Sequence, residues 1–211
     1  DVLGSRGLGD VYKRQDYTCS PGAMESRLDL YFMPDLSVMR GYERLFDMSR
    51  VVESGIPVRQ CFYGGQDKAA AKKSLGIPED GEHLLVMCGS MGCGPMKRLC
   101  AQLADQLGER QYMTVVCGTN HPLENWLRLR YAGRKNIRVL GFTGEISLLM
   151  DSADLYLTKP GGISTSEAAA KALPWCWLTR CPAASSITGI ILCAPAWLLR
   201  RRSRGSWPGS A

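Results

Sequence analysis

The stretch Thr158–Lys171, TKPGGISTSEAAAK, decides the fold expected for this chain of 211 residues. The apolar residues 153–157 lead into it and predict a buried strand, which Pro160 ends. Gly161 and Gly162 then predict a tight turn that leaves no side chain in the way of a ligand. A helix is predicted directly after the turn. Strand, turn and helix bring free backbone N–H groups and a helix N-terminus to one point, which suits a phosphate group.

Glu167 in this stretch has two interpretations. The Ala-, Glu- and Lys-rich residues 165–172 predict the helix, and Ser164 is its expected N-cap. Ser164-x-x-Glu167 then reads as a capping box, in which the carboxylate accepts a hydrogen bond from the Ser164 N–H. Alternatively, a carboxylate at a phosphate-binding helix start accepts hydrogen bonds from two ribose hydroxyls. These residues alone favour the cap.

A second glycine-rich turn follows the apolar residues 84–88, in the stretch LLVMCGSMGCGP of residues 84–95. Pro95 stands near the first position of the next expected helix. The glycine spacing, with Gly89 first, matches neither the dinucleotide fingerprint nor the Walker A loop. Two strand–turn–helix units of this kind in one chain strengthen the nucleotide-binding interpretation of both.

The apolar periodicity of the rest of the chain predicts alternating strands and helices. Further strands are predicted at residues 28–33, 83–88, 112–117 and 137–140. Helices are predicted at residues 38–54, 67–73, 96–107, 122–129 and 146–150. This order predicts an α/β fold with a Rossmann-like, doubly wound parallel sheet. Ligands bind such sheets at the carboxyl ends of the strands, where both glycine-rich turns fall.

The motif order GIPVRQ–FY, MCGSMGCGP, VVCG, VLGFT and DLYLTKPGGISTSEA resembles the C-terminal half of the family 28 glycosyltransferases, over residues 16–174. Within that family it is similar to the diacylglycerol glycosyltransferases, namely monogalactosyldiacylglycerol synthases and processive diacylglycerol glucosyltransferases. The resemblance implies the C-terminal half of a GT-B fold. It also implies that residues 16–54 end an N-terminal acceptor domain and form the crossover, and that residues 55–174 form a UDP-sugar-binding domain.

The resemblance further implies a UDP-sugar site. No carboxylate pair in the sequence suggests a bound metal, so we expect chemistry without a metal ion or cofactor. Glu167 is expected on the ribose and Phe142 on the uracil, although Phe142 also fits a core aromatic. Arg59 is expected on the diphosphate, although an ordinary surface arginine fits equally well. The other expected contacts come from the two glycine-rich turns: Gly89, Ser90, Met91, Gly92, Gly161, Gly162, Ser164 and Thr165. The catalytic base is expected in the N-terminal half of the intact enzyme.

The function implied is transfer of a hexose from a UDP-hexose donor to a membrane lipid, most simply diacylglycerol, by a protein peripheral to the membrane in the cytoplasm. The fragment itself is expected to be inactive, because the lipid would be bound by the missing N-terminal half. Three alternatives stay open: a UDP-sugar-binding subunit with a separate acceptor-binding partner, a peptidoglycan-type N-acetylglucosaminyltransferase, and a UDP-sugar epimerase. The epimerase is disfavoured, because such epimerases typically carry Gly-Gly-x-Gln-Glu-Glu where this chain has GGISTSE at residues 161–167.

The two ends of the chain differ in character from the middle. Residues 1–15 show no periodicity and are expected to be a non-native or disordered leader. Residues 175–211 carry five arginines and no acid, and they depart from the family pattern after Pro174. Residues 175–178 are apolar and are still expected to pair as the next strand, whereas the tail beyond Thr179 is expected to be loose. A frame error there is our hypothesis, because a one-base shift permits a family-like continuation. The net charge of +6 comes from these ends, so we infer no nucleic-acid partner from it.

Overall fold

The computed structural model describes residues 11–13, 28–41, 43–45, 47–87, 89, 96–159, 161–178 and 192–194. Contacts within the chain divide it into two compact units. The first unit comprises residues 1–58 with 161–166, and the second comprises residues 59–160 with 167–211. Among the residues described, no helix has the length and apolar character needed to cross a membrane.

The first unit contains a three-stranded parallel sheet with the order β1-β2-β3. Its strands are β1 (Val11–Lys13), β2 (Leu30–Met33) and β3 (Val51–Glu53). The predicted strand at residues 28–33 is therefore confirmed over residues 30–33. The expectation that residues 1–15 lack packed structure is wrong for β1, because its backbone groups pair with β2.

The helix expected over residues 38–54 is wrong. Three short 3-10 helices occupy this segment instead, before β3: η1 (Leu36–Met39), η2 (Glu43–Leu45) and η3 (Met48–Arg50). Gly41 has a φ of +87°, which a continuous right-handed helix excludes. Asp35 and Asp47 accept hydrogen bonds from Ser37 N and Ser49 N, so local side-chain caps start new turns there.

The second unit is built on a six-stranded sheet with the order β6-β5-β4-β7-β8-β9. Its strands are β4 (Glu82–Met87), β5 (Gln111–Val116), β6 (Ile137–Leu140), β7 (Leu155–Thr158), β8 (Trp175–Trp177) and β9 (Leu192–Ala194). All neighbours are parallel except β8 and β9, which are antiparallel. The sequence predicted the strands up to β8. It did not predict β9, because the tail was expected to be loose.

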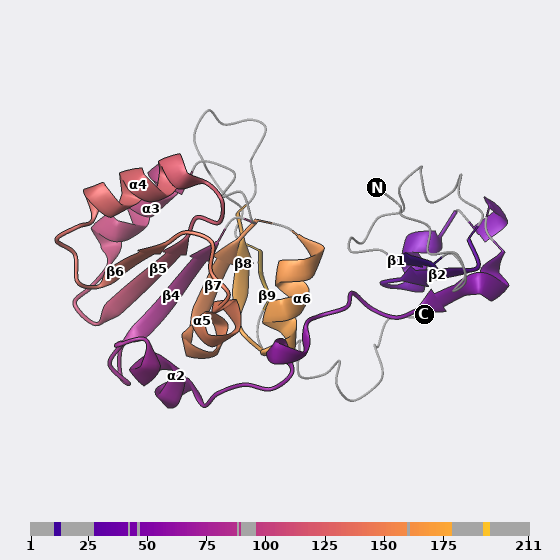
Figure 1. Ribbon diagram of the computed structural model, residues 1–211, viewed down its shortest axis with the longest axis horizontal. Helices are drawn as coiled ribbons and strands as arrows, with labels where there is room; N and C mark the ends of the chain where they lie inside the picture. Colours follow the sequence, from indigo (N-terminus) through magenta and orange to yellow (C-terminus); the bar gives the residue numbers. More distant parts are fainter. Residues whose placement is uncertain are drawn as a thin grey trace. The chain divides into compact units, whose positions relative to one another are not determined.

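Helices cover both faces of this sheet, as Figure 1 shows. The helices of the second unit are α2 (Lys68–Ser74), α3 (Met96–Gln106), α4 (His121–Arg130) and α5 (Ile146–Ser152), and α6 (Gly162–Ala170) continues into it from the first unit. Helices α3 and α4 pack on one face, where Val86, Met113 and Leu127 belong to one buried cluster. Helices α2 and α5 pack together on the other. The doubly wound α/β sheet predicted from the sequence is confirmed.

Candidate functional site

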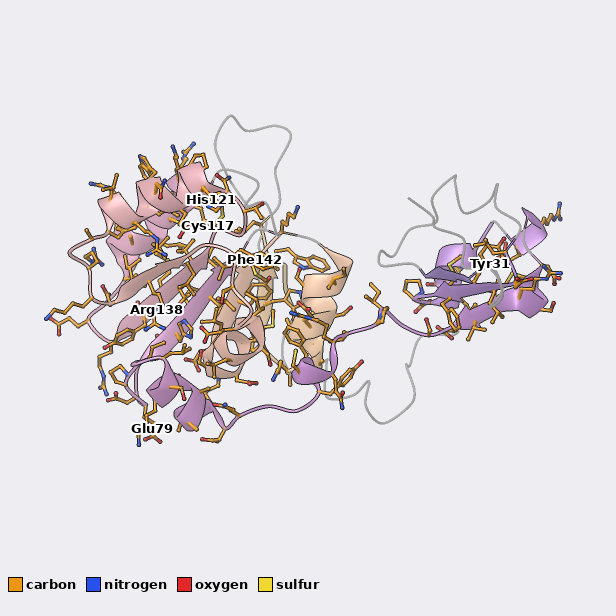
Figure 2. The ribbon with its side chains drawn as sticks, viewed as in Figure 1. Tyr31, Glu79, Cys117, His121, Arg138 and Phe142 are labelled. Atoms are coloured by element: carbon orange, nitrogen blue, oxygen red, sulfur yellow. The ribbon has the colours of Figure 1, made fainter. Side chains whose placement is uncertain are left out.

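The carboxyl edge of the sheet in the second unit is the candidate site. From the central strand β4 the chain passes outward to β5 and β6, and then returns to β7 on the other side of β4. Ligands of open α/β sheets bind outside the carboxyl ends of the strands at such a reversal of strand order. Cys117, His121 and Phe142 lie toward this edge, and Glu79 lies at the opposite edge (Figure 2).

Gly89 and Lys159 meet at this reversal, because they follow the ends of the neighbouring strands β4 and β7. Gly89 has a φ of +76°. A Cβ atom on it would lie 2.7 Å from Lys159 Cε and 3.1 Å from Lys159 Nζ, so this close approach requires glycine. Within the described part of the chain, the Lys159 ammonium has no carboxylate partner. The predicted contacts Ser90, Met91 and Gly92 lie outside the described residues.

Lys159 is the functional candidate that sequence reasoning missed. Its signal was available, because a cation stands between the end of a predicted strand and a glycine-rich turn. The sequence could not show that Lys159 lies beside Gly89, because Gly89 belongs to the turn after the neighbouring strand β4.

Phe142 follows β6 and is 76% exposed. The alternative of a core aromatic is therefore wrong, and the ring is free to stack on a planar ligand. The turn beside it is tightly packed, since a Cβ on Gly141 would lie 2.5 Å from Glu124 Oε2. Glu124 is held by Arg128, whose Nη2 lies 2.9 Å from Glu124 Oε1. This turn thus presents an exposed aromatic ring.

Arg59 and Glu167 form the only charge pair among the predicted site residues that the structure describes. Arg59 Nη2 lies 3.6 Å from Glu167 Oε1. The Arg59 side chain is 61% exposed and the Glu167 side chain 9% exposed. Burial raises the pKa of the Glu167 carboxyl, and the Arg59 guanidinium opposes that rise. Arg59 also stacks on the buried Phe62, with its Cζ 5.0 Å from the ring centroid.

The start of α6 differs from the prediction. Thr165 N donates to Gly161 O at 3.2 Å, so Gly161 is the N-cap and Ser164 is the third helical residue. The expected Ser164 cap and its capping box with Glu167 are therefore wrong. Thr165 Oγ1 donates to Gly161 O at 2.6 Å. Gly161 and Gly162 let the helix begin three residues earlier than the Ser164 pattern indicated.

Metal-binding side chains do not gather in the part of the chain described: no group of three or more His, Cys, Asp or Glu could hold an ion there. Burial raises the pKa of the Cys117 thiol to about 11. The Cys117 thiol therefore carries its proton at neutral pH.

The fold is the mixed α/β, Rossmann-like fold of GT-B glycosyltransferases. The crystal structure of Anabaena Alr3699/HepE in complex with UDP and glucose has a TM-score of 0.50 at 14% identity, covering 78% of this chain and 51% of that chain. A putative UDP-N-acetylglucosamine 2-epimerase from Listeria monocytogenes has a TM-score of 0.52 at 14% identity, covering 72% and 43%. At these identities the likeness concerns the fold alone.

Residues 83–179 match the model of the Glycosyltransferase family 28 C-terminal domain, which confirms the resemblance seen in the sequence. A processive diacylglycerol beta-glucosyltransferase of Staphylococcus haemolyticus is 28% identical over 134 residues, covering 64% of this chain and 34% of the relative. A probable chloroplastic monogalactosyldiacylglycerol synthase of Glycine max is 28% identical over 165 residues, covering 74% and 31%. The chain thus spans about a third of the length of these relatives.

Proposed function

We propose that this chain is the donor-binding part of a glycosyltransferase that moves a hexose from a UDP-sugar to a lipid, with diacylglycerol as the acceptor. The observation that carries the proposal is the Arg59–Glu167 pair within a chain that contains a family 28 C-terminal domain. A guanidinium complements a diphosphate, and a carboxylate complements the hydroxyls of a ribose. The names of the diacylglycerol glycosyltransferases among the relatives support the choice of donor and acceptor class.

The chemistry proposed for these residues is stabilisation of the departing diphosphate. Arg59 and Lys159 supply positive charge where the bond to the sugar breaks, and the backbone N–H groups of the two glycine-rich turns add hydrogen bonds. Glu167 orients the ribose and Phe142 contacts the uracil. A base elsewhere in the intact enzyme deprotonates the lipid hydroxyl. No metal ion or cofactor takes part in this proposal, and the intact enzyme would work at the surface of a membrane.

Nucleotide titration tests the donor part of the proposal. We expect the chain to bind UDP more tightly than ADP or GDP in isothermal titration calorimetry, with EDTA present throughout. Equal affinity for all three diphosphates, or no binding, contradicts the uracil and ribose assignments. Binding of UDP that appears only when EDTA is omitted contradicts the metal-free assignment.

The acceptor part needs the intact gene, read from its own start and across the codon of Pro174. We expect that product to form glycolipid on diacylglycerol vesicles with UDP-glucose or UDP-galactose. We expect none from the 211-residue chain under the same conditions. Absence of glycolipid from the intact product contradicts the acceptor assignment, and turnover by the short chain contradicts its proposed dependence on an N-terminal half.

A further inference from the structure

Residues 59–66, called the strap below, enter the second unit with Arg59 at their start and are tied to two helices. We propose that the buried ion pair between Lys171 and Asp151 is a positioning device that holds the strap so that Arg59 faces the diphosphate of the donor. The inference rests on the proposed function, because it assigns Lys171 and Asp151 to the same nucleotide site without placing either in contact with the nucleotide.

Both members of the ion pair contact the C-terminal end of the strap, at residues 64–66. Lys171 Nζ lies 2.7 Å from Asp151 Oδ1, and the two side chains are only 4% and 8% exposed. Lys171 Nζ also donates to Gly64 O at 2.9 Å, and Gln66 N donates to Asp151 Oδ2 at 3.1 Å. A Cβ on Gly65 would lie 2.9 Å from Asp151 Oδ1. The strap therefore passes against the pair with no room for a side chain at residue 65.

The near end of the strap, at Arg59 and Cys61, contacts residues that lie one helical turn before Asp151 and before Lys171. Ser147 Oγ donates to Cys61 O at 2.6 Å, and Ser147 precedes Asp151 by four residues on α5. Glu167, which faces Arg59, precedes Lys171 by four residues, and Lys171 N donates to Glu167 O at 3.2 Å. Because residues four apart share one helix face, two helix faces each contact the strap twice.

Phe62 anchors the strap between its two ends. Its side chain is completely buried, and the Arg59 guanidinium lies over its ring. A buried ion pair is by itself weak support for stability, because removing both charges from water offsets much of their attraction. We assign the ion pair a different role. It defines one backbone path for the strap across α5 and α6, and that path sets the position of the Arg59 side chain.

The second unit offers a matched control in Lys72. Its side chain is 7% exposed, its Nζ lies 2.9 Å from Asp154 Oδ2, and it donates to Gly81 O at 2.8 Å. It therefore repeats the arrangement of Lys171, a buried lysine between an aspartate and a glycine carbonyl, away from the strap. A merely structural role for Lys171 predicts the same consequences for K171M and K72M.

The test measures UDP and uridine affinity of the 211-residue chain by calorimetry for wild type, K171M, K72M, R59A and the double variant K171M/R59A. We expect K171M to weaken UDP binding by about tenfold and uridine binding by less than about twofold, since only UDP carries the diphosphate that Arg59 addresses. K72M should leave both affinities unchanged. R59A should add less than about twofold in the K171M background, because the two changes then remove the same interaction.

Hydrogen exchange of the strap amides is read in parallel and needs no nucleotide. K171M should speed exchange at Gln66 and Phe62, and K72M should not. If wild type binds no UDP, the proposed function fails, and unchanged exchange in K171M would separately overturn the positioning role. Equal loss of UDP affinity in K171M and K72M also overturns it. If K171M does not fold, D151N replaces it with the same expectations, because it keeps the side-chain shape and removes the charge.

Discussion

Arg59 Nη2 lies 3.6 Å from Glu167 Oε1. The exposed guanidinium therefore covers a carboxylate whose side chain is only 9% exposed. The pair joins the entrance of the second unit to the helix that follows β7. A buried carboxylate without a partner is costly, and Arg59 offsets that cost in the absence of a ligand. An incoming nucleotide that satisfies both groups would therefore separate them without leaving either unpaired.

Replacement of Glu167 by alanine should weaken UDP binding at least ~10-fold, since hydrogen bonds to charged groups contribute about 1.5–3 kcal/mol. Uridine binding should weaken by a similar factor, because the proposed partner is the ribose. Titration calorimetry measures both, and E79A is the control that removes an exposed carboxylate at the opposite edge of the sheet. Unchanged UDP affinity with lowered thermal stability would make Glu167 a structural residue only.

Replacement of Phe142 by alanine should leave the free energy of unfolding unchanged within ~0.5 kcal/mol, because an exposed side chain buries little surface on folding. Uridine affinity should fall at least ~5-fold, since stacking of a base on an aromatic ring contributes about 1–3 kcal/mol. L129A is the matched control, as Leu129 is 82% exposed on α4. Full uridine affinity in F142A would restrict the proposed uracil contact to the backbone of Phe142.

Replacement of Gly89 by alanine should displace Lys159 and lower UDP affinity. G76A separates the two effects of the change, because Gly76 has a φ of +68° and open space around its Cβ position. Both variants should lose about 1 kcal/mol of stability from backbone strain. Only G89A should weaken UDP binding, and equal UDP affinity in G89A and wild type would remove Lys159 from the proposed site.

His83 is a buried neutral histidine with a defined tautomer. Ser152 Oγ donates to Leu149 O at 2.9 Å, so it accepts a hydrogen bond from His83 Nδ1, also at 2.9 Å. His83 Nε2 then accepts from Thr114 Oγ1 at 2.8 Å. Burial lowers the pKa of His83 from its ordinary 6.5 to about 4, and the Asp154 carboxylate opposes that change only in part.

The stability of the protein should therefore depend on pH through His83. Between pH 4 and 6.5 the unfolded chain binds a proton that the folded protein does not, so the free energy of unfolding falls as the pH falls through this window. The loss reaches about 3 kcal/mol, and the contribution is complete above pH 6.5. Urea unfolding at several pH values measures the slope, which H83Q should flatten. H121Q, which removes the only other histidine of the chain, is the control; equal slopes in H83Q and H121Q would contradict the assignment.

Replacement of Trp175 by phenylalanine should cost less than ~0.5 kcal/mol of stability or increase it. Its indole Nε1 is buried and finds no acceptor in the described part of the chain, and an unsatisfied buried N–H is unfavourable by about 1–3 kcal/mol. W175A should cost about 3–5 kcal/mol, since it leaves a cavity beside β7. A large loss in W175F would show that the N–H has a partner. Two buried indole N–H groups without an acceptor in the described part of the chain, those of Trp175 and Trp177 in β8, also accord with our hypothesis of a frame error after Pro174.

The sequence by itself determined the α/β class and the order of elements from β4 to β8, because apolar runs and helical periodicity are local signals. It also located the glycine-rich turns and the family motifs. It failed over residues 38–54, where Gly41 and two aspartate caps outweighed the helical pattern, and at Ser164, where two glycines let α6 start early.

Only the tertiary structure decided which distant residues meet. The order β6-β5-β4-β7-β8 follows from backbone pairing between strands far apart in the chain, and it brings Lys159 onto Gly89. Lys171 and Gly64 are 107 residues apart, yet they share a hydrogen bond. Periodicity carries no information about such contacts, because they depend on how whole helices and strands pack against one another.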